Sequence, residues 1–128
     1  MSERISSYRE LNVYQEAFSL AQTVYGISKT WPSEEKYALT DQIRRASRSV
    51  GANIAESWAK RRYPAHFVSK LTDADGELQE TRHWLACASA CNHLNPTEHS
   101  ALTKQCEKIG KMLGSMINHP DGFILKTK

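Results

Sequence analysis

Apolar residues recur at alternating spacings of four and three along most of this 128-residue chain. That spacing places them on one face of an α-helix, because a helix has about 3.6 residues per turn. The clearest run is Phe67, Leu71, Ala74, Leu78, Thr81, Leu85 and Ala88. No segment alternates apolar and polar residues over more than a few positions, so the sequence predicts an all-α protein.

Proline-containing stretches divide this pattern into four segments. Proline disfavours helix at the preceding residue and suits the first turn of the next helix, and the interruptions contain Pro32, Pro64 and Pro96. We expect helices over about residues 9–30, 34–62, 65–93 and 97–118. A loose tail at 119–128 would follow. Short connections between long helices favour an antiparallel up-down four-helix bundle that forms a single domain, 1–128.

The composition is ordinary for a soluble globular protein, with 40% hydrophobic and 24% charged residues. No stretch approaches the roughly 18 consecutive apolar residues that a membrane span needs. The first residues, "MSERISSYREL", lack the apolar run of a secretory signal. We therefore expect a cytoplasmic protein in which Cys87, Cys91 and Cys106 are reduced.

Positive charge is concentrated in residues 42–62. This segment carries six basic residues against Glu56 alone, a local balance of +5 within a net charge of +3. The six are Arg44, Arg45, Arg48, Lys60, Arg61 and Arg62. Arginine forks suit phosphate recognition, so we expect these residues to contact nucleic acid. The alternative is that they pair with acids such as Asp73, Asp75, Glu77 and Glu80, or with acids of another subunit.

Asn53 stands at a heptad position in the otherwise apolar stripe of the second segment, and Glu56 follows three residues later. A buried amide without a partner costs roughly 1 to 3 kcal/mol. A single polar residue in a helical seam often fixes register or oligomeric state. We therefore expect Asn53 to specify the bundle or its oligomer, with Glu56 as its neighbour.

Two further patterns bear on catalysis and metal binding. His83, Cys87 and Cys91 lie on one helical stripe but span about 12 Å, too far to share one zinc ion. We expect no metal and no cofactor. Arg61 and His66 have the R-x4-H spacing that resembles the motif of helical HEPN-type ribonucleases. The chain has no Gly-rich phosphate loop, nucleophile elbow or H-E-x-x-H motif, so we expect no enzymatic activity.

Three stretches, residues 11–25, 31–57 and 67–85, resemble the bacterial four-helix-bundle proteins encoded in 23S rRNA intervening sequences. The strongest match lies at "QIRRA" and "NIAE". More distantly, the chain is similar to the accessory proteins of diversity-generating retroelements. The resemblance implies a four-helix protomer that assembles into a homopentamer with a basic surface and binds nucleic acid.

By position, Arg44 and Arg45 match the paired arginines of that family, and Asn53 and Glu56 match the ends of its N-I-A-E motif. The chain departs from the family pattern at three positions. Glycine is usual where this chain has Ser57, serine where it has Glu77, and phenylalanine where it has Trp31. The added negative charge of Glu77 argues against a nucleic-acid contact near that turn.

Three hypotheses about function follow from these features. The first is a non-enzymatic homo-oligomer that binds nucleic acid, chiefly structured RNA, through its basic surface, with oligomerisation adding avidity. The second is a protein–protein scaffold or adapter with no nucleic-acid role. The third is a ribonuclease that uses Arg61 and His66.

Overall fold

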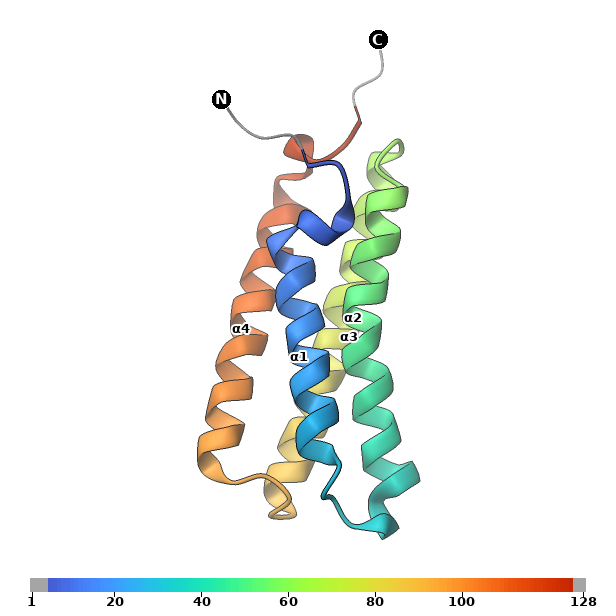
Figure 1. Ribbon diagram of the computed structural model, residues 1–128. Helices are drawn as coiled ribbons and strands as arrows, with labels where there is room; N and C mark the ends of the chain where they lie inside the picture. The colour runs from blue at the N-terminus through green and yellow to red at the C-terminus, as the bar shows by residue number, and fades with distance from the viewer. Residues whose placement is uncertain (1–4, 126–128) are drawn as a thin grey trace.

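Four long helices form an elongated bundle, and successive helices run in opposite directions (Figure 1). The computed structural model describes residues 5–125. The four helices are α1 (Asn12–Ser28), α2 (Asp41–Ala59), α3 (Pro64–Ala90) and α4 (Pro96–Asn118). Residues 5–125 contain no β-strand, which confirms the predicted all-α class.

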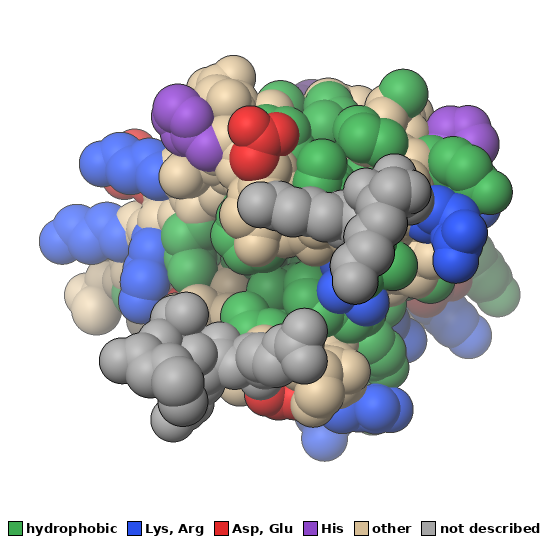
Figure 2. Space-filling view, turned by 90° about the horizontal axis from the view of Figure 1, so that it is seen from above, with side chains coloured by type: hydrophobic (Ala, Val, Ile, Leu, Met, Phe, Trp, Pro, Cys, Tyr) green, Lys and Arg blue, Asp and Glu red, His purple; other side chains and the backbone are tan. Residues whose placement is uncertain are grey.

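The two ends of the bundle carry different connections. The α1–α2 and α3–α4 connections lie at one end, and the α2–α3 connection lies at the other end together with the first and last described residues (Figure 1). Seen from the end that carries the α2–α3 connection, hydrophobic side chains lie centrally while Lys and Arg side chains stand at the rim (Figure 2). None of the helices in residues 5–125 is long and apolar enough to cross a bilayer.

The core is a continuous set of aliphatic side chains contributed by all four helices. The fully buried members of α3 follow the predicted spacing: Phe67, Leu71, Ala74, Leu78, Thr81 and Ala88. The hydroxyl of Thr81 is satisfied within its own helix, since Oγ1 donates to the carbonyl of Glu77 at 2.9 Å. Its burial therefore leaves no unpaired hydroxyl in the core.

The seam of α2 differs from the sequence expectation at one position. Ile54 is fully buried one helical turn after Val50, whereas Asn53 is only half-buried. The Asn53 amide donates to the carbonyl of Ser49 at 2.9 Å, within its own helix. The structure corrects the expected seam: a four-residue step from Val50 keeps an aliphatic side chain inside and moves the amide to the edge.

The second predicted segment, 34–62, is not a uniform α-helix. It begins with a 3-10 turn at Ser33–Glu35 and a single π-helical turn at Lys36–Thr40, and α2 proper starts at Asp41. The wider π turn holds one extra residue and directs two successive side chains, Leu39 and Thr40, inward. Similarly, α1 is preceded by a 3-10 turn at Tyr8–Glu10, which overlaps the start of the helix predicted from residue 9.

The link between α3 and α4 is closely defined by hydrogen bonds. Asn92 adopts a left-handed conformation with φ of 62°. The amide of His93 donates to the carbonyl of Ala88 at 2.8 Å, and that of Asn92 to Ser89 at 3.0 Å. This is the Schellman arrangement that ends a helix and reverses the chain. It ends α3 at Ala90, three residues before the predicted end at 93.

Part of the predicted loose tail packs on the bundle. A 3-10 turn at Pro120–Gly122 precedes Phe123, whose ring stacks on Phe67 with centroids 6.2 Å apart. The amide of Leu125 donates to the carbonyl of Arg61 at 3.1 Å. The tail thus covers the end of the core as far as Leu125, and the remainder of the predicted tail, 126–128, lies outside the described residues.

We predict that replacing Ile54 with alanine lowers the free energy of unfolding by about 2 to 5 kcal/mol, because it leaves a cavity in the seam. Replacing Asn53 with alanine should change it by less than about 1 kcal/mol, since only a bond within one helix is lost. Urea unfolding followed by circular dichroism measures both. A larger loss for Asn53→Ala than for Ile54→Ala would contradict the corrected seam.

Candidate nucleic-acid interface

Two arginines of α2 converge on one tyrosine of α1. The guanidinium carbon of Arg44 lies 4.7 Å from the centroid of the Tyr25 ring, and that of Arg48 lies 5.4 Å from it. Tyr25 as a whole residue is 38% exposed. A guanidinium near an aromatic ring gains a cation–π attraction, which offsets part of the repulsion between the two cations. We call Tyr25, Arg44 and Arg48 the arginine–tyrosine cluster.

Arg44 is held in place by the last turn of α1. Its Nε donates to Ser28 Oγ at 2.8 Å, and that hydroxyl in turn donates to the carbonyl of Tyr25 at 3.1 Å. Ser28 is itself buried, so this bond has a fixed anchor. Within residues 5–125, no carboxylate forms an ion pair with Arg44 or Arg48. Asp41 lines the same hollow but forms no ion pair with either arginine, so the described residues leave both guanidinium groups without a direct carboxylate partner.

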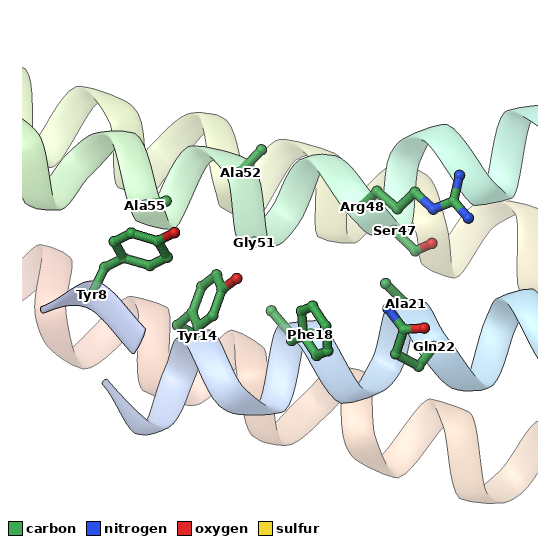
Figure 3. A pocket seen from close by; sticks show the side chains of 11 residues that line it. Tyr8, Tyr14, Phe18, Ala21, Gln22, Ser47, Arg48, Gly51, Ala52 and Ala55 are labelled. Carbon is green, nitrogen blue, oxygen red and sulfur yellow. The ribbon is translucent and has the colours of Figure 1, made fainter. Parts of the chain in front are cut away.

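The cluster stands at one end of a groove between α1 and α2. A hollow of about 500 Å³ lies over Tyr25, Arg44, Arg45 and Arg48. A neighbouring hollow of about 390 Å³ shares Arg48 and Ala52 with it. In Figure 3, Tyr14 and Phe18 of α1 lie opposite Gly51 of α2, and the Tyr8 ring lies beside Ala55. The small residues of α2 leave this space open, and aromatic rings of α1 line its other side.

Arg45 has a different environment from its neighbours. It reaches across to α3, where its guanidinium contacts Glu77 at 3.3 Å and Glu80 at 2.5 Å. The hydrogen bond to Glu80 raises the pKa of Arg45 above its ordinary value. This is the ion-pair arrangement that the sequence left open. Glu77, one of the three residues at which the chain departs from the family pattern, supplies one of the two carboxylates.

The basic residues at the other end of α2 form a separate group. The guanidinium carbon of Arg61 lies 3.6 Å from the centroid of the Trp58 ring, and its Nε donates to the Trp58 carbonyl at 2.8 Å. Partial burial lowers the pKa of Arg61. Lys60 and Arg62 are exposed beside it. Sixteen residues of helix, about 24 Å, separate Arg44 from Lys60, so the six predicted cations do not form one patch.

Asn53 and Glu56 are not partners. The amide of Asn53 bonds to Ser49 as described above, whereas Glu56 pairs with Lys70 of α3 at 3.1 Å. A hydrogen bond to Glu56 raises the pKa of Lys70. Both side chains lie on the outer part of α2, so any role in specifying an oligomer would act through exposed atoms.

The other candidate sets are separated by the structure. His83 and Cys87 are in contact, with 3.6 Å between the Nε2 and Sγ atoms. Cys91 instead lies with Glu35 and His93. Arg61 stacks on Trp58, while His66 packs beside Tyr63 with centroids 5.5 Å apart. The R-x4-H residues therefore have different partners.

The aromatic lining of the groove was missed at the sequence level. Phe18 and Tyr25, on the edge of α1, are 53% and 38% exposed. They follow the buried residues Ala17 and Val24 by one position each. Their seven-residue spacing predicts a second, aromatic stripe along the edge of α1, and this signal could have revealed the groove.

Comparisons with known proteins place this fold in a family. The family model described as "23S rRNA-intervening sequence protein" matches residues 9–115. The chain belongs to this family. Its fold is similar to a crystal structure of a protein of unknown function from the S23 ribosomal protein family of Bacteroides thetaiotaomicron VPI-5482. That structure is 26% identical, with a TM-score of 0.74, over 83% of this chain and 95% of the other. No curated protein matches the chain.

The contacts of Arg45 predict an acid-dependent contribution to stability in this member of the 23S rRNA-intervening sequence protein family. Hydrogen bonds from Trp84 and then from Arg45 hold the pKa of Glu80 below its usual value. A carboxyl with a lowered folded-state pKa stabilises the protein above its unfolded pKa of about 4.3, and the contribution is lost as the pH falls through the folded-state value.

We therefore predict that Glu80→Gln lowers the free energy of unfolding at pH 7 by up to about 1 kcal/mol, since the pair is substantially exposed. The difference from wild type should shrink below about pH 4, where the wild-type carboxyl becomes protonated. Urea unfolding at pH 7 and pH 3 measures both values. The matched control is Glu107→Gln, at an exposed position of α4. An equal loss in both variants, or a loss that persists at pH 3, would contradict this account.

Proposed function

We propose that this protein is a non-enzymatic, cytoplasmic protein that forms a homo-oligomer and binds structured RNA at unpaired nucleotides. The observation that carries the proposal is the arginine–tyrosine cluster, in which two guanidinium groups without a described carboxylate partner converge on an exposed ring. The family match is consistent with RNA as the ligand, because the family is described by its link to a 23S rRNA intervening sequence.

The chemistry of the cluster suits unpaired nucleotides better than a regular duplex. Unpaired bases stack on aromatic rings and on guanidinium planes, while arginine forks contact phosphate oxygens. Tyr25, Arg44 and Arg48 offer both kinds of contact at the edge of one groove. The small side chain of Ala52 leaves space there for a base or a ribose.

The remaining cations take different parts in this proposal. Arg45 is occupied by Glu77 and Glu80, so its role is to hold α2 against α3 rather than to bind phosphate. Lys60 and Arg62 are exposed about 24 Å from Arg44 and form a second, weaker phosphate contact. An RNA with an unpaired loop next to a helix is long enough to reach both groups.

We predict that the double variant Arg44→Gln/Arg48→Gln binds a stem-loop fragment of ribosomal RNA at least about tenfold more weakly at low salt. The slope of log affinity against log salt should fall by about 1 for each arginine removed. Fluorescence anisotropy at several salt concentrations measures both quantities. The matched control is Lys104→Gln/Lys111→Gln, which removes the same charge from exposed positions of α4.

The outcome separates a local contact from a general charge effect. Equal loss of affinity in the two double variants would mean that net charge alone drives binding. Unchanged affinity in Arg44→Gln/Arg48→Gln would remove the cluster from the interface. In either case the proposed role of the arginine–tyrosine cluster fails.

The aromatic end of the groove supports the self-association part of the proposal. Phe18 is 53% exposed, and it lies beside Tyr14 with ring centroids 6.1 Å apart. Across the groove, Gly51, Ala52 and Ala55 present little side-chain bulk (Figure 3). A second copy that packs here would cover apolar surface that is otherwise in contact with water. A homopentamer remains the number implied by the family resemblance.

The scaffold hypothesis uses the same surface with a different protein as its partner. Exposed aromatic side chains are enriched at protein–protein interfaces, so Phe18 favours this second candidate as well. The two candidates differ in one respect that is simple to measure. Self-association is visible with the purified protein alone, whereas an adapter remains a monomer until its partner is added.

We predict that Phe18→Glu shifts the purified protein from an oligomer to a monomer in analytical ultracentrifugation, because burying a charge at the interface is unfavourable. The matched control is Tyr37→Glu, which adds the same charge at a residue that is 74% exposed in the α1–α2 connection. The control should keep the wild-type mass. A monomeric wild-type protein would contradict self-association and favour the adapter.

A further inference from the structure

Three side chains with metal-ligand atoms meet at the end of the bundle that carries the α1–α2 and α3–α4 connections. They are Glu35, Cys91 and His93, and their carboxylate oxygen, Sγ and ring nitrogen atoms all lie within 4.8 Å of one another. One of these pairs, His93 Nε2 and Glu35 Oε2, is 2.9 Å apart. The residues are far apart in the sequence, so the fold brings them together.

The backbone on both sides fixes these ligands. Glu35 ends the 3-10 turn at Ser33–Glu35, and its amide donates to the Pro32 carbonyl at 2.9 Å. Cys91 and His93 flank the left-handed Asn92 in the hydrogen-bonded turn that ends α3. A capping box then starts α4: the Glu98 amide donates to Asn95 Oδ1 at 2.7 Å, and the Asn95 amide donates to Glu98 Oε1 at 3.1 Å. These hydrogen bonds therefore fix the backbone of both connections before a metal ion binds.

The cluster is partly shielded from water. The side chains of His93 and Glu35 are 15% and 23% exposed, and that of Cys91 is open to solvent. Trp31 is buried beside them, with its ring centroid 6.1 Å from that of His93. A hydrophobic side chain next to metal-binding residues limits the access of solvent to the ion and lowers the local dielectric constant.

We propose that Glu35, Cys91 and His93 bind a divalent transition-metal ion, for which Zn²⁺ is the best fit. Zn²⁺ takes thiolate, imidazole and carboxylate ligands in tetrahedral geometry, and three protein ligands leave the fourth position for water. Metal–ligand bonds of about 2.0 to 2.3 Å in a tetrahedron require small shifts of the three side chains, in which the His93 and Glu35 atoms, 2.9 Å apart, separate slightly. On binding, the Cys91 thiol releases its proton to solvent. The proton that His93 Nε2 shares with Glu35 also leaves that nitrogen, so that His93 binds the ion as a neutral imidazole with its proton on Nδ1. The ion then replaces the hydrogen bond between His93 and Glu35.

A bound ion ties the α1–α2 connection to the α3–α4 connection. Because these ligands are assembled only in the folded chain, metal binding stabilises the folded state. At a free Zn²⁺ concentration about 100 times the dissociation constant, the unfolding equilibrium constant falls about 100-fold. The site shares no residue with the arginine–tyrosine cluster, so a test of metal binding does not depend on whether the protein binds RNA.

The chain provides its own control for this site. His83 and Cys87 on α3 are a histidine–cysteine pair with 3.6 Å between Nε2 and Sγ. They lack a third ligand: within residues 5–125, only Glu35, Cys91 and His93 bring three such atoms together. The third cysteine, Cys106, is buried, and burial raises the pKa of its thiol to about 11. Cys87→Ser therefore removes a thiol that is not part of the proposed site.

The experiment is a titration of the full-length apoprotein with Co²⁺ as a spectroscopic probe, followed by thermal unfolding with and without Zn²⁺. We expect one Co²⁺ per chain, a cobalt–thiolate charge-transfer band in the near ultraviolet, and a rise of several degrees in melting temperature with Zn²⁺. Cys91→Ser should lose the band and most of the rise, and His93→Gln and Glu35→Gln should weaken both. Cys87→Ser should behave as wild type.

Two results would overturn the proposal. One is a cobalt–thiolate band that survives in Cys91→Ser and disappears in Cys87→Ser, which would move the site to His83 and Cys87. The other is a wild-type protein whose melting temperature and spectrum do not respond to either ion. Far-ultraviolet circular dichroism of each variant confirms that it folds, and Cys91 is exposed, so its replacement by serine leaves the core intact.

Discussion

The packing of one face of α2 against the rest of the bundle determines what this protein presents to its surroundings. Ile43, Val50 and Ile54 are fully buried on that face, between the neighbouring helices α1 and α3. Because each residue of a helix turns by about 100°, their burial fixes the direction of every other side chain on α2. Arg44 and Arg48 fall on the side of α1, and Arg45 falls on the side of α3. Adjacent arginines thus acquire opposite roles.

Much of the fold could be predicted from the sequence because it depends on spacing within single helices. The apolar positions of α3 follow an unbroken 4-3 pattern, and each is buried. The choice between Asn53 and Ile54 was harder, since both fit a heptad step from Val50. A straight helix drifts by about 20° per heptad, and this drift favours the four-residue step to Ile54. The π-helical turn at Lys36–Thr40 has no signal in apolar spacing.

The candidate sites were less predictable because their partners lie on other helices. The sequence identified the arginines but left open whether they meet phosphates or carboxylates. The answer requires the position of Glu77 and Glu80 on α3 and of Tyr25 on α1. The grouping of Cys91 and His93 with Glu35 likewise depends on two connections meeting at one end of the bundle. Cys91 was therefore grouped with His83 and Cys87, its neighbours in the sequence.

We propose that RNA binds this protein at Tyr25, an exposed residue whose ring is flanked by Arg44 and Arg48. Nuclear magnetic resonance of the ring protons can detect this contact, with selectively labelled tyrosine and a short single-stranded oligoribonucleotide. If the bases stack on Tyr25, its ring resonances should shift upfield on titration, while those of the more exposed Tyr37 should stay unchanged. Unshifted Tyr25 resonances at saturating RNA, or equal shifts at both rings, would show that RNA does not bind at Tyr25.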